Sequence, residues 1–318
     1  MGKATFSSSF TNASDATFRA WVGAFLGALD AAGAARAPDT GQIDPSTITV
    51  PGSVNGVAGY AMYFLDDALH ATHPVYIRLQ FGRGATTASR PAMWLTIGKA
   101  TDGAGGMSQI LLPETNVSGV GVSTESTTVF DGIAVAGDGY LALMPGINDS
   151  TTDIRTNYVL VERSRTHDGA PYGDALLVAG GAPTSAQSHG HFAYVPPIRA
   201  ITYSAGGSME WTAPVVLPAR VNGNVIGSGS SLAAGGIGPV FPWVLMAPSV
   251  APWQSCVFVT YPPGDFPGGD FETTLCGGTA TFRPVALSVR YAFGITAQPN
   301  AQTATYNRTG GLAVRWED

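Results

Sequence analysis

Two histidines on either side of a glycine, His189-Gly190-His191, are the residues whose types and spacing most directly suggest chemistry. On a β-strand, residues i and i+2 project from the same face, so both imidazoles could bind one metal ion. Three copies of the chain around an axis would bring six imidazoles together. No cluster of other metal-ligating residues surrounds the motif, so the alternative is a solvated pair of loop histidines. His189 and His191 are therefore candidate ligands only, and the sequence predicts no metal centre and no cofactor.

Acidic residues close to histidines form a second candidate. Asp66 and Asp67 precede His70 and His73 at nearly helical spacing, which is compatible with a metal site or with acid–base chemistry. The alternative is a polar connection, with room for one helical turn, that leads into the strand starting at Val75.

Two further pairs of aspartates could hold calcium. Asp149 and Asp153 flank a Ser-Thr-Thr run, and Asp265 and Asp270 flank a Gly-Gly pair. Neither pair follows the Asp-x-Asn-x-Asp-Gly loop with its late glutamate. Aspartates that cap turns are the alternative.

Signals for catalysis are weak. The serine- and glycine-rich run at 227–231 lacks a Gly-x-Ser-x-Gly elbow between a strand and a helix. The glycine-rich run at 103–106 has no Lys-Ser/Thr ending of the kind that cradles phosphate. The sequence therefore predicts no catalytic residue, and we expect a protein that is not an enzyme.

The elements that would position such residues begin with one amphipathic helix. Ser14 or Asp15 can cap its first turn, and Gly33 can adopt the left-handed conformation that closes its last. Either it is a core helix, or it docks against a neighbouring subunit. Its apolar residues recur at i, i+3, i+4, i+7, i+8 and i+11, which gives one continuous stripe: Phe18, Trp21, Val22, Phe25, Leu26 and Leu29.

Most of the remaining chain consists of short alternating or β-branched runs separated by glycine and proline. A meander over 60–98, covered by the helix, would make a small core. We expect a mainly β fold of β-sandwich-like domains with one N-terminal amphipathic helix. The boundary is placed at Ala170 and Pro171, which gives a helix-plus-β domain, 1–170, and a C-terminal β-rich domain, 171–318. Strands are expected at 4–10, 60–65, 75–82, 91–98, 127–143, 158–163, 175–178, 191–197, 215–218, 240–248, 256–261, 285–293 and 312–316.

Composition limits the class of protein. Only 12% of the 318 residues are charged, 45% are hydrophobic, and 41 are glycine, which suits an all-β protein with much surface buried against other subunits. A net charge of −6 argues against nucleic acid as the main partner. The N-terminus lacks an apolar signal-peptide core, and no run is long enough for a membrane span, so we expect no membrane insertion. Cys256 and Cys276 are either neighbours in a reduced core or one bridge.

Four motifs stand out in the first third of the chain: Asp15-Ala16-Thr17-Phe18-Arg19-Ala20-Trp21, Asp39-Thr40-Gly41-Gln42-Ile43-Asp44, Phe64-Leu65-Asp66-Asp67-Ala68-Leu69-His70 and Trp94-Leu95-Thr96-Ile97-Gly98. In this order they resemble a group of tailed-bacteriophage virion structural proteins. The resemblance covers roughly residues 6–106 and carries over no catalytic motif. It implies a place in the virion, assembled in the host cytoplasm, with other copies and other virion proteins as partners.

The first hypothesis is therefore a non-enzymatic, homo-oligomeric component of a phage tail, baseplate or tail-fibre attachment, with a collar or capsid-associated protein as the second choice. Its interface candidates are Phe18, Trp21, Phe25, Leu29, Phe241 and Trp243. A second hypothesis is a receptor-binding module in which Trp253, Tyr261 and Phe266 stack on surface carbohydrate. A third is a polysaccharide-cleaving tail enzyme, which would need two carboxylates converging in a groove.

Overall fold

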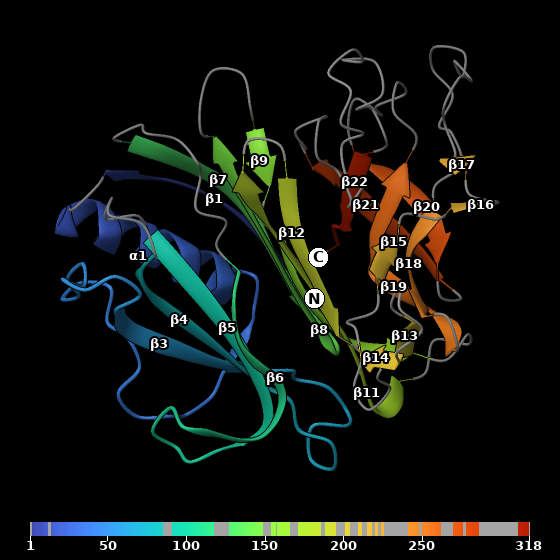
Figure 1. Cartoon of the computed structure of the whole chain (residues 1–318), viewed down its shortest axis with the longest axis horizontal. Coiled ribbons are helices and arrows are strands. Elements are labelled where there is room, and N and C mark those ends of the chain that lie inside the picture. The colour runs from blue at the N-terminus through green and yellow to red at the C-terminus, as the bar shows by residue number, and fades with distance from the viewer. Residues whose placement is uncertain are drawn as a thin grey trace. The chain divides into compact units, whose positions relative to one another are not determined.

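The chain folds into strands, with one helix in the part that the structure describes (Figure 1). The mainly β fold of sandwich-like character, with one helix near the N-terminus, is thereby confirmed. The computed structural model describes residues 2–11, 14–84, 91–117, 127–148, 154–156, 158–165, 171–185, 188–194, 201–203, 209–211, 215–217, 220–221, 224–225, 241–247, 250–261, 270–275, 278–285 and 311–317.

Two compact units make up the chain. The first holds Met1–Val159, Gly181–Ala186 and Asp318, and the second holds Leu160–Gly180 and Gln187–Glu317. The two units therefore interleave between residues 160 and 187. The domain boundary expected at residue 170 falls inside this interleaved stretch and stays a prediction.

Helix α1 (Asp15–Ala31) begins and ends as its sequence predicts. The Ser14 hydroxyl caps the first turn by accepting a hydrogen bond from the Thr17 amide at 3.3 Å. Gly33, at φ +75°, takes the left-handed conformation just after the helix. The apolar stripe is buried, since no side chain in it is more than 2% exposed.

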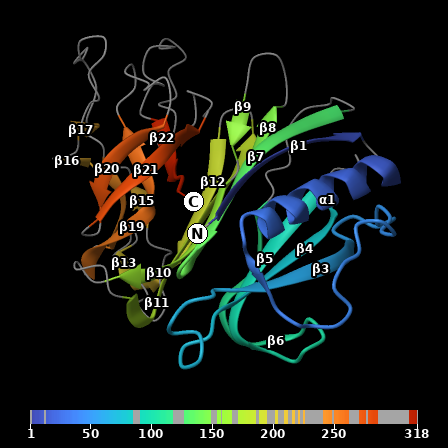
Figure 2. The same cartoon turned by 180° about the vertical axis from the view of Figure 1, so that it is seen from behind.

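In the first unit, strands on two sides enclose α1. Figure 2 shows α1 lying between β1 and the strands β3 to β5. On one side, β1 (Gly2–Thr11) pairs with β7 (Thr127–Gly137), β7 pairs with β8 (Tyr140–Asn148), and the short β9 (Ile154–Thr156) lies beside β8. On the other side is a five-stranded antiparallel sheet in chain order, made of β2 (Ala35–Arg36), β3 (Val57–Phe64), β4 (Tyr76–Arg83), β5 (Pro91–Thr101) and β6 (Met107–Asn116).

Aromatic side chains fill the space around the helix. The Trp21 ring lies 6.5 Å from Phe10 of β1 and 5.6 Å from Phe81 of β4, measured between ring centroids. Phe25 likewise contacts Phe6 at 5.5 Å and Phe81 at 5.7 Å. Each such ring contributes about 1.5–3 kcal/mol through its burial. The helix therefore holds the two sides of the unit together.

The second unit contains most of β10 (Tyr158–Arg165, beginning in the first unit), most of β11 (Pro171–Ser185, ending in the first unit) and β12 (Ser188–Tyr194). β11 is the sheet neighbour of both β10 and β12. This unit also contains a six-stranded sheet in the order β15 (Val215–Leu217), β18 (Phe241–Ala247), β19 (Val250–Tyr261), β22 (Gly311–Arg315), β21 (Gly278–Val285) and β20 (Phe271–Leu275). Two small hairpins pair β13 (Ile201–Tyr203) with β14 (Met209–Trp211) and β16 (Arg220–Val221) with β17 (Asn224–Val225).

A buried carboxylate ties β10 to β19 within the second unit. Glu162 is 3% exposed and accepts hydrogen bonds from the Ser255 hydroxyl at 2.6 Å and from the Cys256 amide at 2.7 Å. Cys256 is disulfide-bonded, and the only other cysteine of the sequence, Cys276, lies outside the described residues. Of the two alternatives left open by the sequence, the structure thus favours the bridged one.

Candidate functional site

His189 and His191 lie on β12, two residues apart on a strand, as a shared metal site would require. Their side chains are outside the described part of the structure, so their candidacy as ligands stays a prediction. Across the residues whose side chains are described, no three or more His, Cys, Asp or Glu come close enough together to hold a metal ion.

The segment of Asp67, His70 and His73 folds as a series of turns. Asp67 Oδ1 accepts a hydrogen bond from the Leu69 amide at 2.9 Å, and the His73 amide donates to the Leu69 carbonyl at 2.7 Å. The His70 ring packs against Phe64, with 4.5 Å between ring centroids. The residues therefore form a capped polar turn and an aromatic contact, which is the alternative to a metal or acid–base site.

The predicted calcium ligands are only partly described. Asp270 forms a two-pronged ion pair with Arg283, at 2.8 Å for both contacts, and the guanidinium lies 4.0 Å from the centre of the Trp316 ring. Asp149, Asp153, Asp265 and the serines at 227–231 lie outside the described residues.

Of the interface and carbohydrate-binding candidates, only those on α1 have side chains in the described part of the structure. Phe18, Trp21, Phe25 and Leu29 are buried within the first unit, so the core-helix alternative accounts for the stripe. Phe241 and Trp243 lie on β18, and Trp253 and Tyr261 on β19, but their side chains are not described, and Phe266 lies outside the described residues. Their proposed roles stay predictions.

The structure assembles a different polar cluster on the five-stranded sheet, where the tip of the β5–β6 hairpin meets the segment before β3. We call this cluster, made of Asp39, Tyr60, Arg78, Thr101 and Gly105, the Gly105 hub. The Gly105 amide donates to Asp39 Oδ2 at 3.1 Å, and the Gly105 carbonyl accepts from Arg78 Nη1 at 3.0 Å. One residue therefore links, through its amide and its carbonyl, a carboxylate and a guanidinium that lie far apart in the sequence.

Asp39, the carboxylic acid of the hub, is buried, at 7% exposure. Its Oδ2 also accepts from the Thr101 hydroxyl, while its Oδ1 is buried and accepts no hydrogen bond in the described part of the chain. The free lone pairs of such an oxygen can accept a hydrogen bond from water or bind a cation. Asp102, an acidic residue of the same hairpin tip, accepts hydrogen bonds from the Ala104 and Gly106 amides at 2.8 and 2.9 Å.

The remaining members of the hub are also bonded to backbone or to neighbouring strands. The Tyr60 hydroxyl donates to the Thr40 carbonyl. Arg78 Nη2 donates to Thr96 Oγ1 at 3.2 Å and lies 3.6 Å from a carboxylate oxygen of Glu114. Loss of hydration on burial, followed by the negative charges of Asp39 and Asp102, raises the pKa of Tyr60. The hub thus contains acid–base residue types, but their polar atoms mainly hold loops in place.

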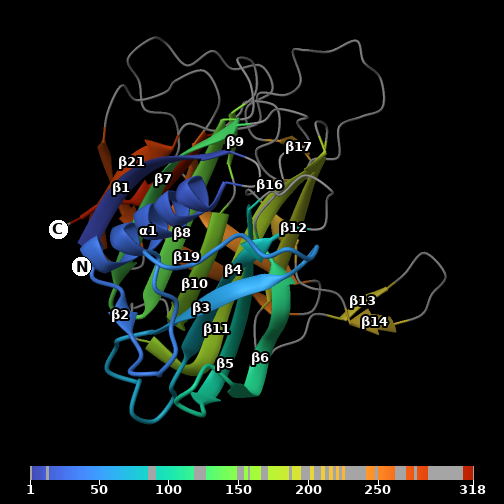
Figure 3. The same cartoon turned by 90° about the vertical axis from the view of Figure 1, so that its left-hand side faces the viewer.

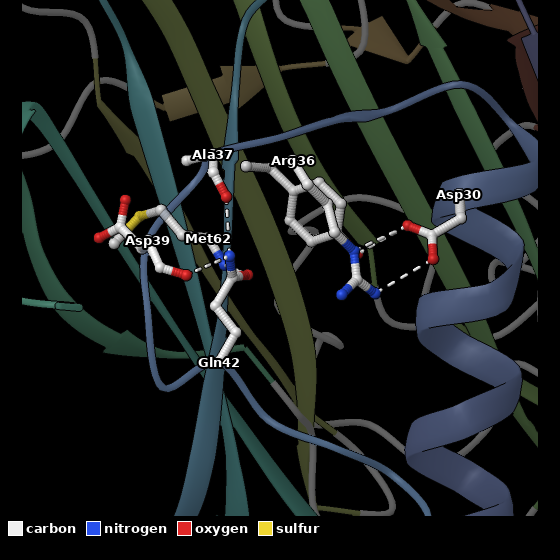
Figure 4. Close-up of polar contacts among 7 residues, drawn as sticks. Asp30, Arg36, Ala37, Asp39, Gln42 and Met62 are labelled. Atoms are coloured by element: carbon white, nitrogen blue, oxygen red, sulfur yellow. Dashed lines mark hydrogen bonds and ion pairs between the residues drawn. The ribbon is translucent and has the colours of Figure 1, made fainter. Parts of the chain in front are cut away.

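Beside the hub, Gln42 replaces a missing strand neighbour along β3 (Figure 4). Its amide nitrogen donates to the carbonyl oxygens of Ala37 and Asp39 at 2.7 and 3.1 Å, and its oxygen accepts from the Met62 amide at 2.9 Å. In this way one side chain fixes both the bend of the 37–42 segment and its distance from β3.

A charged clamp joins the end of α1 to β2. Arg36 contacts both carboxylate oxygens of Asp30, at 2.9 and 3.1 Å, and lies 5.5 Å from the centre of the Tyr63 ring (Figure 4). Burial, the largest effect, raises the pKa of Tyr63 far above its ordinary value, and the Asp30 charge adds to the rise while Arg36 opposes it. The sequence alone predicts neither the clamp nor the hub. The clamp forms when β2 pairs with β3, and the hub forms when the tip of the β5–β6 hairpin meets the segment before β3.

No family model matches the chain. Comparisons with curated proteins and with solved structures find no match either. The resemblance over residues 6–106 therefore stays a prediction. Within the described residues, no helix is both long and apolar enough to cross a bilayer.

Proposed function

We propose that this protein is a non-enzymatic structural component of a bacteriophage virion, an oligomeric part of the tail, baseplate or tail-fibre attachment. The motifs of residues 6–106 and the low charge of the chain support this proposal. A position in the collar or on the capsid belongs to the same class and is the second choice. The protein would be made in the host cytoplasm and would bind other copies of itself and other virion proteins.

The observation that carries the proposal is that aspartate side chains hydrogen-bond to the backbone of loops. Asp39, Asp44, Asp67 and Asp102 each accept hydrogen bonds from backbone amides of their own or neighbouring loops. Carboxylates used in this way restrain loops. A protein that must keep its shape under load has use for such restraints, whereas a hydrolase needs carboxylates that face its substrate.

Light scattering of the purified full chain tests the proposal. We expect a closed oligomer of fixed size, three or six copies being the numbers that match the symmetry of a tail. A chain that stays monomeric up to the highest soluble concentration would contradict self-assembly. A second assay incubates the protein with capsular and lipopolysaccharide preparations, and the release of oligosaccharides would instead assign it to the polysaccharide-cleaving tail enzymes.

A further inference from the structure

Strand β1 ends its sheet and is unusually regular. It pairs with β7 over ten consecutive residue pairs, from Gly2 with Ala136 to Thr11 with Thr127, without a register shift. Figure 3 shows β1 beside β7, and among the described strands β7 is its only sheet neighbour. Within the described part of the chain, the other long edge of β1 therefore has no strand paired to it.

Half of the backbone polar groups of β1 point toward this open edge. In an antiparallel pair, the amide and carbonyl groups of successive residues face alternate sides of the strand. Among the backbone hydrogen bonds found outside helices and strand ladders in the described chain, none involves a residue of β1. The open edge thus carries a row of donors and acceptors that a further strand could satisfy.

The other edge strands lack this combination of length and regularity. Proteins protect exposed edges by keeping them short or by breaking them with bulges and prolines. β6 also has ten residues, but it contains Pro113, a positive φ at Gln109 and two register shifts against β5. Of the other strands that end a larger sheet, β2 has two residues, β15 three, β20 five and β12 seven. β1 has neither a proline nor a bulge.

The side chains of β1 also suit pairing with another strand. Phe6 and Phe10 pack against Phe25 and Phe18 of α1, so one face of the strand is anchored on the helix. On the opposite face Thr5, Ser7 and Ser9 are exposed, and Lys3 is the only charged residue of the strand. A strand that is already ordered before it binds loses little conformational entropy on pairing.

We propose that β1 pairs edge to edge with β1 of a second copy of this chain, antiparallel about a two-fold axis, so that one sheet continues across both copies. Such pairing is self-complementary, since the same edge is offered by both partners. With all ten residues paired, Lys3 of one copy lies opposite Phe10 of the other, so the two Lys3 positions are about 23 Å apart at about 3.3 Å per residue. That distance exceeds the screening length of about 8–10 Å at physiological salt, so the two charges do not oppose pairing.

The choice of a second copy as partner rests on the proposed function. The number of copies in the oligomer distinguishes the β1 pairing from the proposed virion function. Pairing about a two-fold axis requires an even number of copies, so a hexamer made of three β1-linked pairs contains it, whereas a trimer does not. A stable trimer would therefore leave the virion proposal standing and overturn the β1 pairing.

The test uses two neighbouring proline substitutions in the full chain, Ser7→Pro and Ser8→Pro. Proline lacks the amide proton, and the amides of residues 7 and 8 face opposite edges of β1. One variant removes a donor from the β1–β7 ladder and lowers the melting temperature. The other variant removes a donor from the open edge only, so we expect its melting temperature to equal that of the wild type. Its oligomer should have half the wild-type mass by light scattering, because the β1–β1 contact is lost.

Hydrogen exchange provides a second measurement that needs no substitution. In the wild-type protein, alternate amides of β1 should exchange fast at low protein concentration and slowly at high concentration, while amides of β6 show no such change. The proposal is overturned if both proline variants keep the wild-type mass. It is equally overturned if β1 exchange is independent of concentration, an outcome that remains decisive even if both variants fail to fold.

Discussion

Replacing Gly105 by alanine gives the sharpest test of the Gly105 hub. Gly105 has φ +91°, and a Cβ atom added there would lie 2.4 Å from Tyr60 Cζ and 2.5 Å from Tyr60 Cε1. A side chain at this φ costs about 1–2 kcal/mol in backbone strain. Overpacking against the ring adds about 1–3 kcal/mol. If the peptide moves away, its bonds to Asp39 and Arg78 are lost instead, at about 0.5–1.5 kcal/mol each.

Gly103 supplies the matched control. It lies in the same hairpin tip at φ +78°, but an added Cβ atom would meet nothing within 4 Å. Gly103→Ala should therefore cost only the strain, about 1–2 kcal/mol. Gly105→Ala should cost about 2–5 kcal/mol, the sum of strain and overpacking. The difference between the two variants measures the contact with Tyr60.

The assay is native-state hydrogen exchange of amides in β4 and β5, which reports the opening free energy of the first unit separately from the second. A double-mutant cycle with Tyr60→Ala completes it, because removing the ring should reduce the cost of Gly105→Ala to that of Gly103→Ala. Equal costs for Gly105→Ala and Gly103→Ala in the wild-type background, or no coupling to Tyr60, would refute the reasoning.

Three further predictions concern the clamp, the 37–42 segment and the helix. Because the pKa of Tyr63 is raised, the folded protein keeps a phenolic proton that the unfolded chain releases above the ordinary tyrosine pKa of 10.0. The free energy of unfolding should therefore fall as the pH rises above 10.0, and it should fall less steeply in Tyr63→Phe. Thermal melts of both proteins at a series of pH values check this prediction. Gln42→Glu removes two donors and should cost about 1–3 kcal/mol, seen as faster exchange of the Met62 amide, whereas Gln109→Glu at an exposed site should cost little. Trp21→Asp should abolish the folded β signal in circular dichroism, because Trp21 is 2% exposed and lies within the core; a variant that stays β-rich and only dissociates would restore the docking-helix interpretation.

Local patterns were enough to predict the helix and most strands of the first unit. The stripe from Phe18 to Leu29, the Ser14 cap and the left-handed Gly33 all act within a few residues of one another, and the structure confirms them. The meander over 60–98 follows from alternation in β3, β4 and β5. The expected strands do not include β6, because Pro113 interrupts its pattern, and the structure shows bulges in its pairing with β5.

The hub could not be predicted in the same way. Asp39, Arg78 and Gly105 lie in three segments with no shared periodicity, and only the folding of the hairpin tip toward β3 brings them together. Glycine-rich sequence at 103–106 signalled a turn, but nothing in it indicated which carboxylate or guanidinium the turn would bind. The pairing of β1 with β7 could not be predicted either, because an alternating pattern predicts a strand but not the strand with which it pairs.

The pairing of β1 with β7 also has a consequence for the order of folding. Thr11 must find Thr127 and Gly2 must find Ala136, so this ladder closes a loop of more than a hundred residues. Pairing over such long separations is slow, because the entropy of loop closure is lost before the contacts form. During synthesis, β1 and α1 leave the ribosome before β7, the partner strand of β1, which follows only after the five-stranded sheet has been made. The apolar face of α1 can meanwhile pack on β4, so we expect the sheet and helix to fold first and β1 to join last. Until β7 is available, β1 lacks its ladder, which makes β1 the segment through which the unfinished chain is most prone to aggregate.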